Sequence, residues 1–120
     1  MRALQWLGVA VLTSIGFTAS ADCRTDTTGD AYCGRGSCIA ARNGVIWCSR
    51  FFQGGAHRTR DGKVVCGKGQ CEKSSRGEIY CSSVTGGAVL KDSKGLVRCT
   101  GQCERGSSAY CEHTRADSAG

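Results

Sequence analysis

The chain has 120 residues, of which ten are cysteine, eighteen are glycine and none is proline, and its formal net charge is +6 at pH 7. This length suffices for one small domain and excludes a large multidomain protein. Large aliphatic side chains are few after residue 21, so burial alone does not offset the cost of ordering the chain, roughly 1.5 kcal/mol per residue. Covalent cross-links are therefore expected to hold the fold.

The first 21 residues, MRALQWLGVAVLTSIGFTASA, have the order of a secretory signal peptide. A basic start at Arg2 precedes an apolar stretch from Ala3 to Phe17, and small residues follow at 19–21. A membrane-spanning helix is the alternative, but the apolar stretch is short and interrupted by polar residues. We expect cleavage after Ala21, with a secreted, extracellular protein that begins at Asp22.

All ten cysteines follow this segment, and an even number in a small secreted chain indicates a disulfide framework. The cysteines are Cys23, Cys33, Cys38, Cys48, Cys66, Cys71, Cys81, Cys99, Cys103 and Cys111. Zinc binding is the alternative, and the C-x4-C spacing with only two histidines disfavours it. Five bridges at about 2–4 kcal/mol each would match the net stability of a whole domain, although the spacing leaves their pairing open.

Nine of these cysteines form three triads that repeat along the chain. The segments CGRGSCIAARNGVIWC (33–48) and CGKGQCEKSSRGEIYC (66–81) are offset by 33 residues at every cysteine, and a third, shorter copy begins at Cys99. Such a period indicates a repeated supersecondary unit, here at about 29–61, 62–94 and 95–113. Three cysteines cannot all pair with one another, so at least one cysteine of each triad must bond to a cysteine outside it. Cys23 is interpreted as the closing cysteine of a missing preceding repeat.

Local patterns predict β-structure throughout residues 22–113. The short runs VIWC, KVVC, EIYC and LVRC are β-branched or aromatic and follow glycine-containing turns. We therefore predict an all-β, small disulfide-rich domain of three ~33-residue β-hairpin repeats in a compact pseudo-threefold arrangement. The segment 114–120 is expected to be a frayed polar tail.

The candidate binding surface lies where the repeats differ most, in the linker SRFFQGGAHRTRDG (49–62). Aromatic side chains beside arginines are typical of protein hot spots, of sugar or base stacking, and of lipid interfaces. The candidate residues are Trp47, Arg50, Phe51, Phe52, His57, Arg58 and Arg60. The alternative, which the sequence leaves open, is that the aromatic rings fill a scarce core and the arginines are simply solvated.

Motifs for catalysis are missing from the sequence. It contains no nucleophile elbow, metal motif, phosphate loop or spaced carboxylate pair. We therefore expect no enzymatic activity, no catalytic residue, no metal and no cofactor.

The blocks WCSRFFQGGAHRTRDGKVVCGKGQC and YCSSVTGGAVLKDSKGLVRCTGQC, with the signal sequence, resemble small secreted cysteine-rich proteins of filamentous fungi. Proteins of that kind are discussed as candidate effectors and elicitors. The resemblance implies action outside the cell by binding an extracellular host protein or a cell-wall component.

Two other functions stay open at this point. A cationic antimicrobial or toxin acting on membranes fits the net charge and the Arg-Phe-Phe stretch, and a lectin-like binder of wall polysaccharide fits the aromatic–cysteine pairs. An anionic surface is a further partner that the basic charge allows, and no specific nucleic acid is expected.

Overall fold

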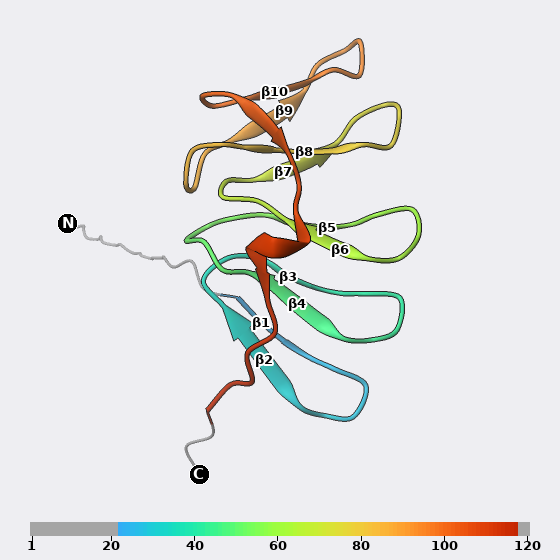
Figure 1. Ribbon diagram of the computed structural model, residues 1–120, viewed down its shortest axis with the longest axis vertical. Coiled ribbons are helices and arrows are strands. Elements are labelled where there is room, and N and C mark those ends of the chain that lie inside the picture. The colour runs from blue at the N-terminus through green and yellow to red at the C-terminus, as the bar shows by residue number, and fades with distance from the viewer. Residues whose placement is uncertain (1–21, 118–120) are drawn as a thin grey trace, which may run out of the picture.

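The computed structural model describes residues 22–117, which form five β-hairpins stacked one on another along the molecule (Figure 1). The strands are β1 Asp22–Thr25, β2 Ala31–Gly34, β3 Cys38–Ala40, β4 Ile46–Ser49, β5 Ala56–Arg58, β6 Val64–Cys66, β7 Cys71–Lys73, β8 Ile79–Ser82, β9 Val89–Lys91, β10 Val97–Cys99, β11 Cys103–Arg105 and β12 Cys111–Glu112. Hairpins 1 to 5 are the antiparallel pairs β1–β2, β3–β4, β5–β6, β7–β8 and β9–β10.

Every hairpin turns in the same way. A glycine stands four residues before the last cysteine of each hairpin, and all five of these glycines have φ between 83° and 93°. In hairpin 3, for example, the Thr59 N–H donates to the Lys63 carbonyl (2.7 Å) and the Gly62 N–H donates to the Thr59 carbonyl (3.0 Å). This three-residue loop with glycine in the left-handed region matches the twist of an antiparallel pair. Each G-x-x-x-C pattern thus marks one hairpin. The 33-residue repeat contains two such patterns and therefore corresponds to two successive hairpins.

Three hairpins are closed by a disulfide between directly opposed residues. These bridges are Cys23–Cys33, Cys38–Cys48 and Cys71–Cys81. In hairpins 3 and 5, Ala56 and Val89 stand opposite Cys66 and Cys99, so these cysteines have no sulfur across the hairpin. Their bonds are Cys66–Cys111 and Cys99–Cys103.

Each triad therefore has one internal bridge and one cysteine bonded outside it, as an odd number requires. Cys23 lies opposite Cys33, in the place that Ala56 takes in hairpin 3. The interpretation of Cys23 as the closing cysteine of a missing repeat is therefore wrong, because it is the opening-strand residue of hairpin 1.

The third repeat does not complete its second hairpin. Its segment SSAYC has Ser107 where the other five copies have glycine, and Ser107 is extended (φ −136°) and caps the 3-10 helix η2 (Ser108–Tyr110). Instead, β11 pairs with β8, and β12 pairs with β4. Residues 103–117 thus run back along the stack, and we call them the C-terminal strap (Figure 1).

The strap continues to hairpin 1, which corrects the expectation of a frayed tail for residues 114–117. The Cys33 N–H donates to the Thr114 carbonyl (3.1 Å), and the Ala116 N–H donates to the Ala31 carbonyl (2.9 Å). Arg115 also forms an ion pair with Asp30 (2.6 Å). Strand-like pairing with β2 therefore orders this polar segment, while 118–120 lie outside the described residues.

Cysteine is the commonest residue of the core. Of the nine hydrophobic residues that are buried within residues 22–117, five are cysteines, and Cys48, Cys66 and Cys81 are fully buried. The hydroxyls of two fully buried serines, Ser49 and Ser82, donate to the carbonyls of Gly67 (2.8 Å) and Thr100 (2.6 Å) and so tie hairpins together. The predicted all-β, disulfide-rich fold class is confirmed.

The hairpins follow one another in a line instead of surrounding a threefold axis (Figure 1), because each flat hairpin lies against the next.

The proposed signal peptide, residues 1–21, lies outside the described residues. Within residues 22–117, no helix is long and apolar enough to cross a membrane.

Candidate ligand-binding cleft

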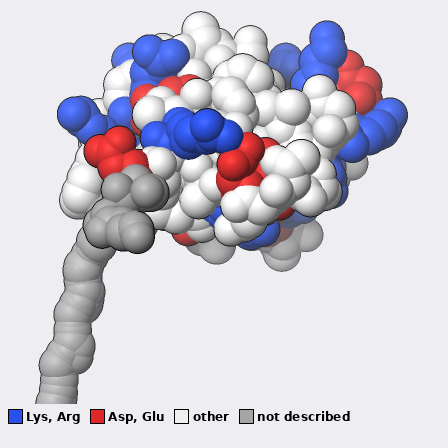
Figure 2. All heavy atoms as spheres, turned by 90° about the horizontal axis from the view of Figure 1, so that it is seen from below, with Lys and Arg blue, Asp and Glu red and all other residues white. Residues whose placement is uncertain are grey.

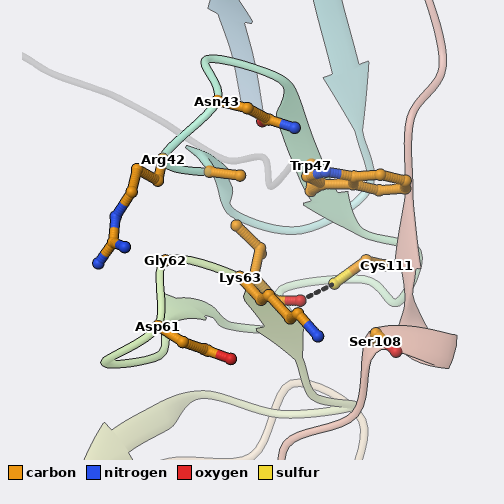
Figure 3. Close-up of a pocket in the computed structure, with 10 residues that line it drawn as sticks. Arg42, Asn43, Trp47, Asp61, Gly62, Lys63, Ser108 and Cys111 are labelled. Atoms are coloured by element: carbon orange, nitrogen blue, oxygen red, sulfur yellow. Dashed lines mark hydrogen bonds between the residues drawn. The ribbon is translucent and has the colours of Figure 1, made fainter.

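A cleft of about 380 Å³ opens between the turns of hairpins 2 and 3, and we call it cleft 1 (Figure 3). Its lining residues are Ala41, Arg42, Asn43, Trp47, Asp61, Gly62, Lys63, Val64, Ser108 and Cys111. Trp47 lies on β4, opposite Ile39, and its half-buried indole packs on the core cluster that contains Val64 and Cys66. The ring is therefore fixed by packing while still forming part of the cleft wall.

Polar side chains from three separate segments line the cleft together with this indole. Asn43 comes from the turn of hairpin 2, Asp61 and Lys63 come from the turn of hairpin 3, and Ser108 comes from η2 (Figure 3). The Arg42 side chain points away from the cleft, and its Nη2 donates to the Arg60 carbonyl (3.0 Å). The cleft thus combines one apolar ring with hydrogen-bond donors and acceptors.

Asp61 is the carboxylate of this cleft. A hydrogen bond from the Thr59 hydroxyl lowers the pKa of Asp61, and the positive charge of Lys63 lowers it further. The group is therefore ionised over the whole neutral and mildly acidic range. It offers a strong hydrogen-bond acceptor in the lining of the cleft.

The strap fixes the rear wall of cleft 1. Cys66 and Ser107 exchange two backbone hydrogen bonds, of 3.0 and 2.9 Å, and the Cys66–Cys111 disulfide anchors the next turn of the strap. Ser108 and Cys111 are thus held against hairpin 3, so the cleft is formed before any ligand arrives.

Similar clefts recur between the turns of the next hairpins. The cleft between hairpins 3 and 4 has about 430 Å³ and contains Val65, and the cleft between hairpins 4 and 5 has about 420 Å³ and contains Tyr80. Their repetition follows from the stacking of equal turns. Only cleft 1 of these three is lined by an indole.

The structure does not gather the seven predicted binding residues on one surface. Trp47 lines cleft 1, and Arg58 and Arg60 lie toward the hairpin turns. His57 is half-buried on β5, where burial lowers its pKa.

The remaining three lie on the other side of the stack, in the loop between hairpins 2 and 3. Arg50 donates from Nη2 to the Cys111 carbonyl (2.9 Å). The ring of Phe51 is half-buried against Tyr110, edge to face at 5.0 Å, whereas Phe52 is 54% exposed. Of the two phenylalanines, one therefore belongs to the interior and one to the surface.

Sequence reasoning missed the polar residues of cleft 1, namely Asn43, Asp61, Lys63 and Ser108. A signal for the first three was present, because they flank the glycine of G-x-x-x-C in consecutive hairpins. Ser108 carried no such signal, since its place depends on the strap.

The surface around the lower end of the stack carries acidic groups beside basic ones (Figure 2). Within residues 22–117, no group of three or more His, Cys, Asp or Glu side chains is arranged to hold a metal ion. No family model, no curated protein and no solved structure matches the chain.

Proposed function

We propose that the protein is a non-enzymatic, extracellular binding protein, and that cleft 1 holds one sugar unit of a cell-wall or host-surface polysaccharide. The observation that carries this proposal is the fixed indole of Trp47 in a cleft ringed by Asn43, Asp61, Lys63 and Ser108. An indole face packs on the C–H face of a sugar ring, and convergent polar groups orient its hydroxyls.

Binding is favoured over hydrolysis by the chemistry of the lining residues. Glycoside hydrolysis ordinarily needs two carboxyl groups on either side of the scissile bond. The lining residues of cleft 1 contain one, Asp61, and no histidine. Five disulfides in a small domain are consistent with an extracellular protein. The resemblance to secreted fungal proteins supports an effector- or elicitor-like role at a wall or host surface.

The intrinsic fluorescence of Trp47 tests this proposal without any substitution. The full chain is expressed in a secreting host, purified from the medium, and titrated with soluble oligomers of chitin, cellulose and pectin. We expect one oligomer class to change the Trp47 emission saturably, at low and at high salt, because the ring contact is not ionic. If no oligomer changes the emission and no insoluble polymer retains the protein, the proposal is wrong.

A pair of matched variants locates the site. Ser108→Tyr fills cleft 1, whereas Ser93→Tyr adds the same side chain to another exposed serine, in the turn of hairpin 5, that lines none of the three clefts. We expect Ser108→Tyr to lower affinity at least about tenfold, the equivalent of about 1.4 kcal/mol, and Ser93→Tyr to leave it unchanged. Equal losses in both variants would place the sugar elsewhere.

A further inference from the structure

The five loops that connect successive hairpins, and hairpin 5 to β11, form the side of the stack opposite the hairpin turns (Figure 1). We call this side the connecting-loop face; its segments are 35–37, 50–55, 67–70, 83–88 and 100–102. None of the ten acidic residues of the chain lies in these segments, whereas Arg35, Arg50 and Lys68 do. The turns of hairpins 1, 3, 4 and 5, by contrast, each contain at least one acidic residue, and only the turn of hairpin 2 has none.

Hydrogen bonds join these loops into one continuous surface. The Gln53 N–H donates to the Arg35 carbonyl (3.2 Å), and the Gly86 N–H donates to the Lys68 carbonyl (3.0 Å). Gln70 also donates from Nε2 to the Gln53 carbonyl. These bonds connect the four loops 35–37, 50–55, 67–70 and 83–88, three of which carry one basic residue each.

Two large apolar side chains are exposed on the same face. Phe52 is 54% exposed and Val84 is 44% exposed. In the same loop as Phe52, Phe51 is half-buried against Tyr110 (5.0 Å), and the Lys68 ammonium lies 5.5 Å from the centre of the Tyr110 ring. Phe51 is thus covered by the strap, which leaves Phe52 as the exposed ring of this loop.

The carboxylates nearest to this face along the chain are Glu72 and Glu104, each two residues beyond a connecting segment. Glu72 forms an ion pair with Lys91 (3.9 Å), a residue of β9. No ion pair within residues 22–117 involves a basic residue of the connecting-loop face, so the positive charge around the exposed apolar groups is not paired with a carboxylate.

We propose that the connecting-loop face docks on an anionic lipid bilayer, with Arg35 and Lys68 at the headgroups and Phe52 and Val84 in the interface. A polyanion would satisfy the charges but would offer no apolar phase for the two hydrophobic side chains, whereas a bilayer provides both. Each basic residue contributes about a fivefold factor to binding at an anionic surface. Because cleft 1 opens among the hairpin turns, a docked protein keeps its sugar site accessible, and this inference does not depend on the proposed function.

The test is flotation of the full chain with vesicles of phosphatidylcholine, with and without phosphatidylserine, at low and high salt. Two double variants with equal charge change are compared. Arg35→Gln/Phe52→Ser alters the connecting-loop face, and Arg76→Gln/Leu96→Ser alters the turn side, where Leu96 is also 54% exposed.

We expect binding only to vesicles with phosphatidylserine, with loss at high salt. The connecting-loop variant should bind at least about tenfold more weakly, since it loses a fivefold charge factor and the aromatic contact, and the turn-side variant should bind as the native protein does. A Phe52→Trp/Trp47→Phe variant gives a second measurement, in which anionic vesicles should shift the emission to the blue.

Three results would overturn the proposal. The first is no flotation with anionic vesicles at low salt, and the second is equal weakening in both double variants, which would mean unspecific charge attraction. The third is retention on a soluble polyanion such as heparin without any vesicle binding, which would assign the face to a polyanion.

Discussion

Removing the Cys66–Cys111 bridge should destabilise the protein more than removing any bridge within a hairpin. The bridge spans 45 residues, whereas Cys71–Cys81 spans 10. Loop-closure entropy gives about 4.0 kcal/mol for the longer loop and about 2.7 kcal/mol for the shorter one at 25 °C. Cys66 and Cys81 are both fully buried, whereas Cys111 is more buried than Cys71, so the difference in lost packing adds to the entropic difference in the same direction.

The assay is urea unfolding of Cys66→Ala/Cys111→Ala and of the control Cys71→Ala/Cys81→Ala, followed by Trp47 fluorescence. Trp47 packs on the cluster that contains Cys66 and Cys111, so its emission reports loss of the strap. We expect the strap variant to be about 1.3 kcal/mol less stable than the control. If the control loses as much or more, chain closure by the strap is not what stabilises the stack.

Two further predictions concern a turn and a titrating group. Gly62→Ala should lower the free energy of unfolding, measured in urea, clearly more than Gly29→Ala does. Both have φ near 90°, but an added Cβ at Gly62 would lie 2.6 Å from the Cβ of Arg42, whereas at Gly29 it would meet nothing within 4 Å. For His57, burial lowers the folded-state pKa below 6.5, so the unfolded state binds the proton more tightly and stability should fall as pH drops from 6.5 through the folded pKa. His57→Gln should flatten this dependence, and a pH profile of this variant equal to that of the native protein would contradict the assignment.

Much of the fold followed from the sequence because hairpins are local structures. The glycine, the β-branched or aromatic run and the cysteine lie within five residues, as in Gly44–Cys48, and the turn alone sets the register. The same argument explains the failure in the third repeat. Ser107 replaces the glycine, so the left-handed turn becomes costly and the segment forms η2.

The cleft was less predictable because it depends on contacts between hairpins. Trp47 stood out by its residue type. Asp61 and Lys63 line the same cleft only because the turn of hairpin 3 stacks on the turn of hairpin 2. Ser108 lines it only because the strap runs back along the stack. The Phe51–Phe52 pair shows the same limit. The alternation of buried and exposed side chains along a strand could not predict which ring is buried, because the pair lies in a loop. Phe51 is the buried one because Tyr110 of the strap covers it.

The pairing of the cysteines depends on one position per hairpin, the residue opposite the closing cysteine. In hairpin 3 that residue is Ala56, in register with Cys66, and Cys66 therefore bonds to Cys111. Ala56→Cys/Cys111→Ala should change this pairing, because it restores the arrangement of hairpin 2, whose opposed cysteines bond with a Cα–Cα distance of 3.9 Å.

We expect the introduced thiol to bond Cys66 and the stack to form without the strap bridge. Replacing a 45-residue closure with a 10-residue one should leave the variant about 1.3 kcal/mol less stable than the native protein. Peptide mapping without reduction identifies the new bridge, and thiol titration counts any cysteine left free. Two free thiols in a folded variant would show that register alone does not select the partner of Cys66, and that the strap must dock before the bond forms.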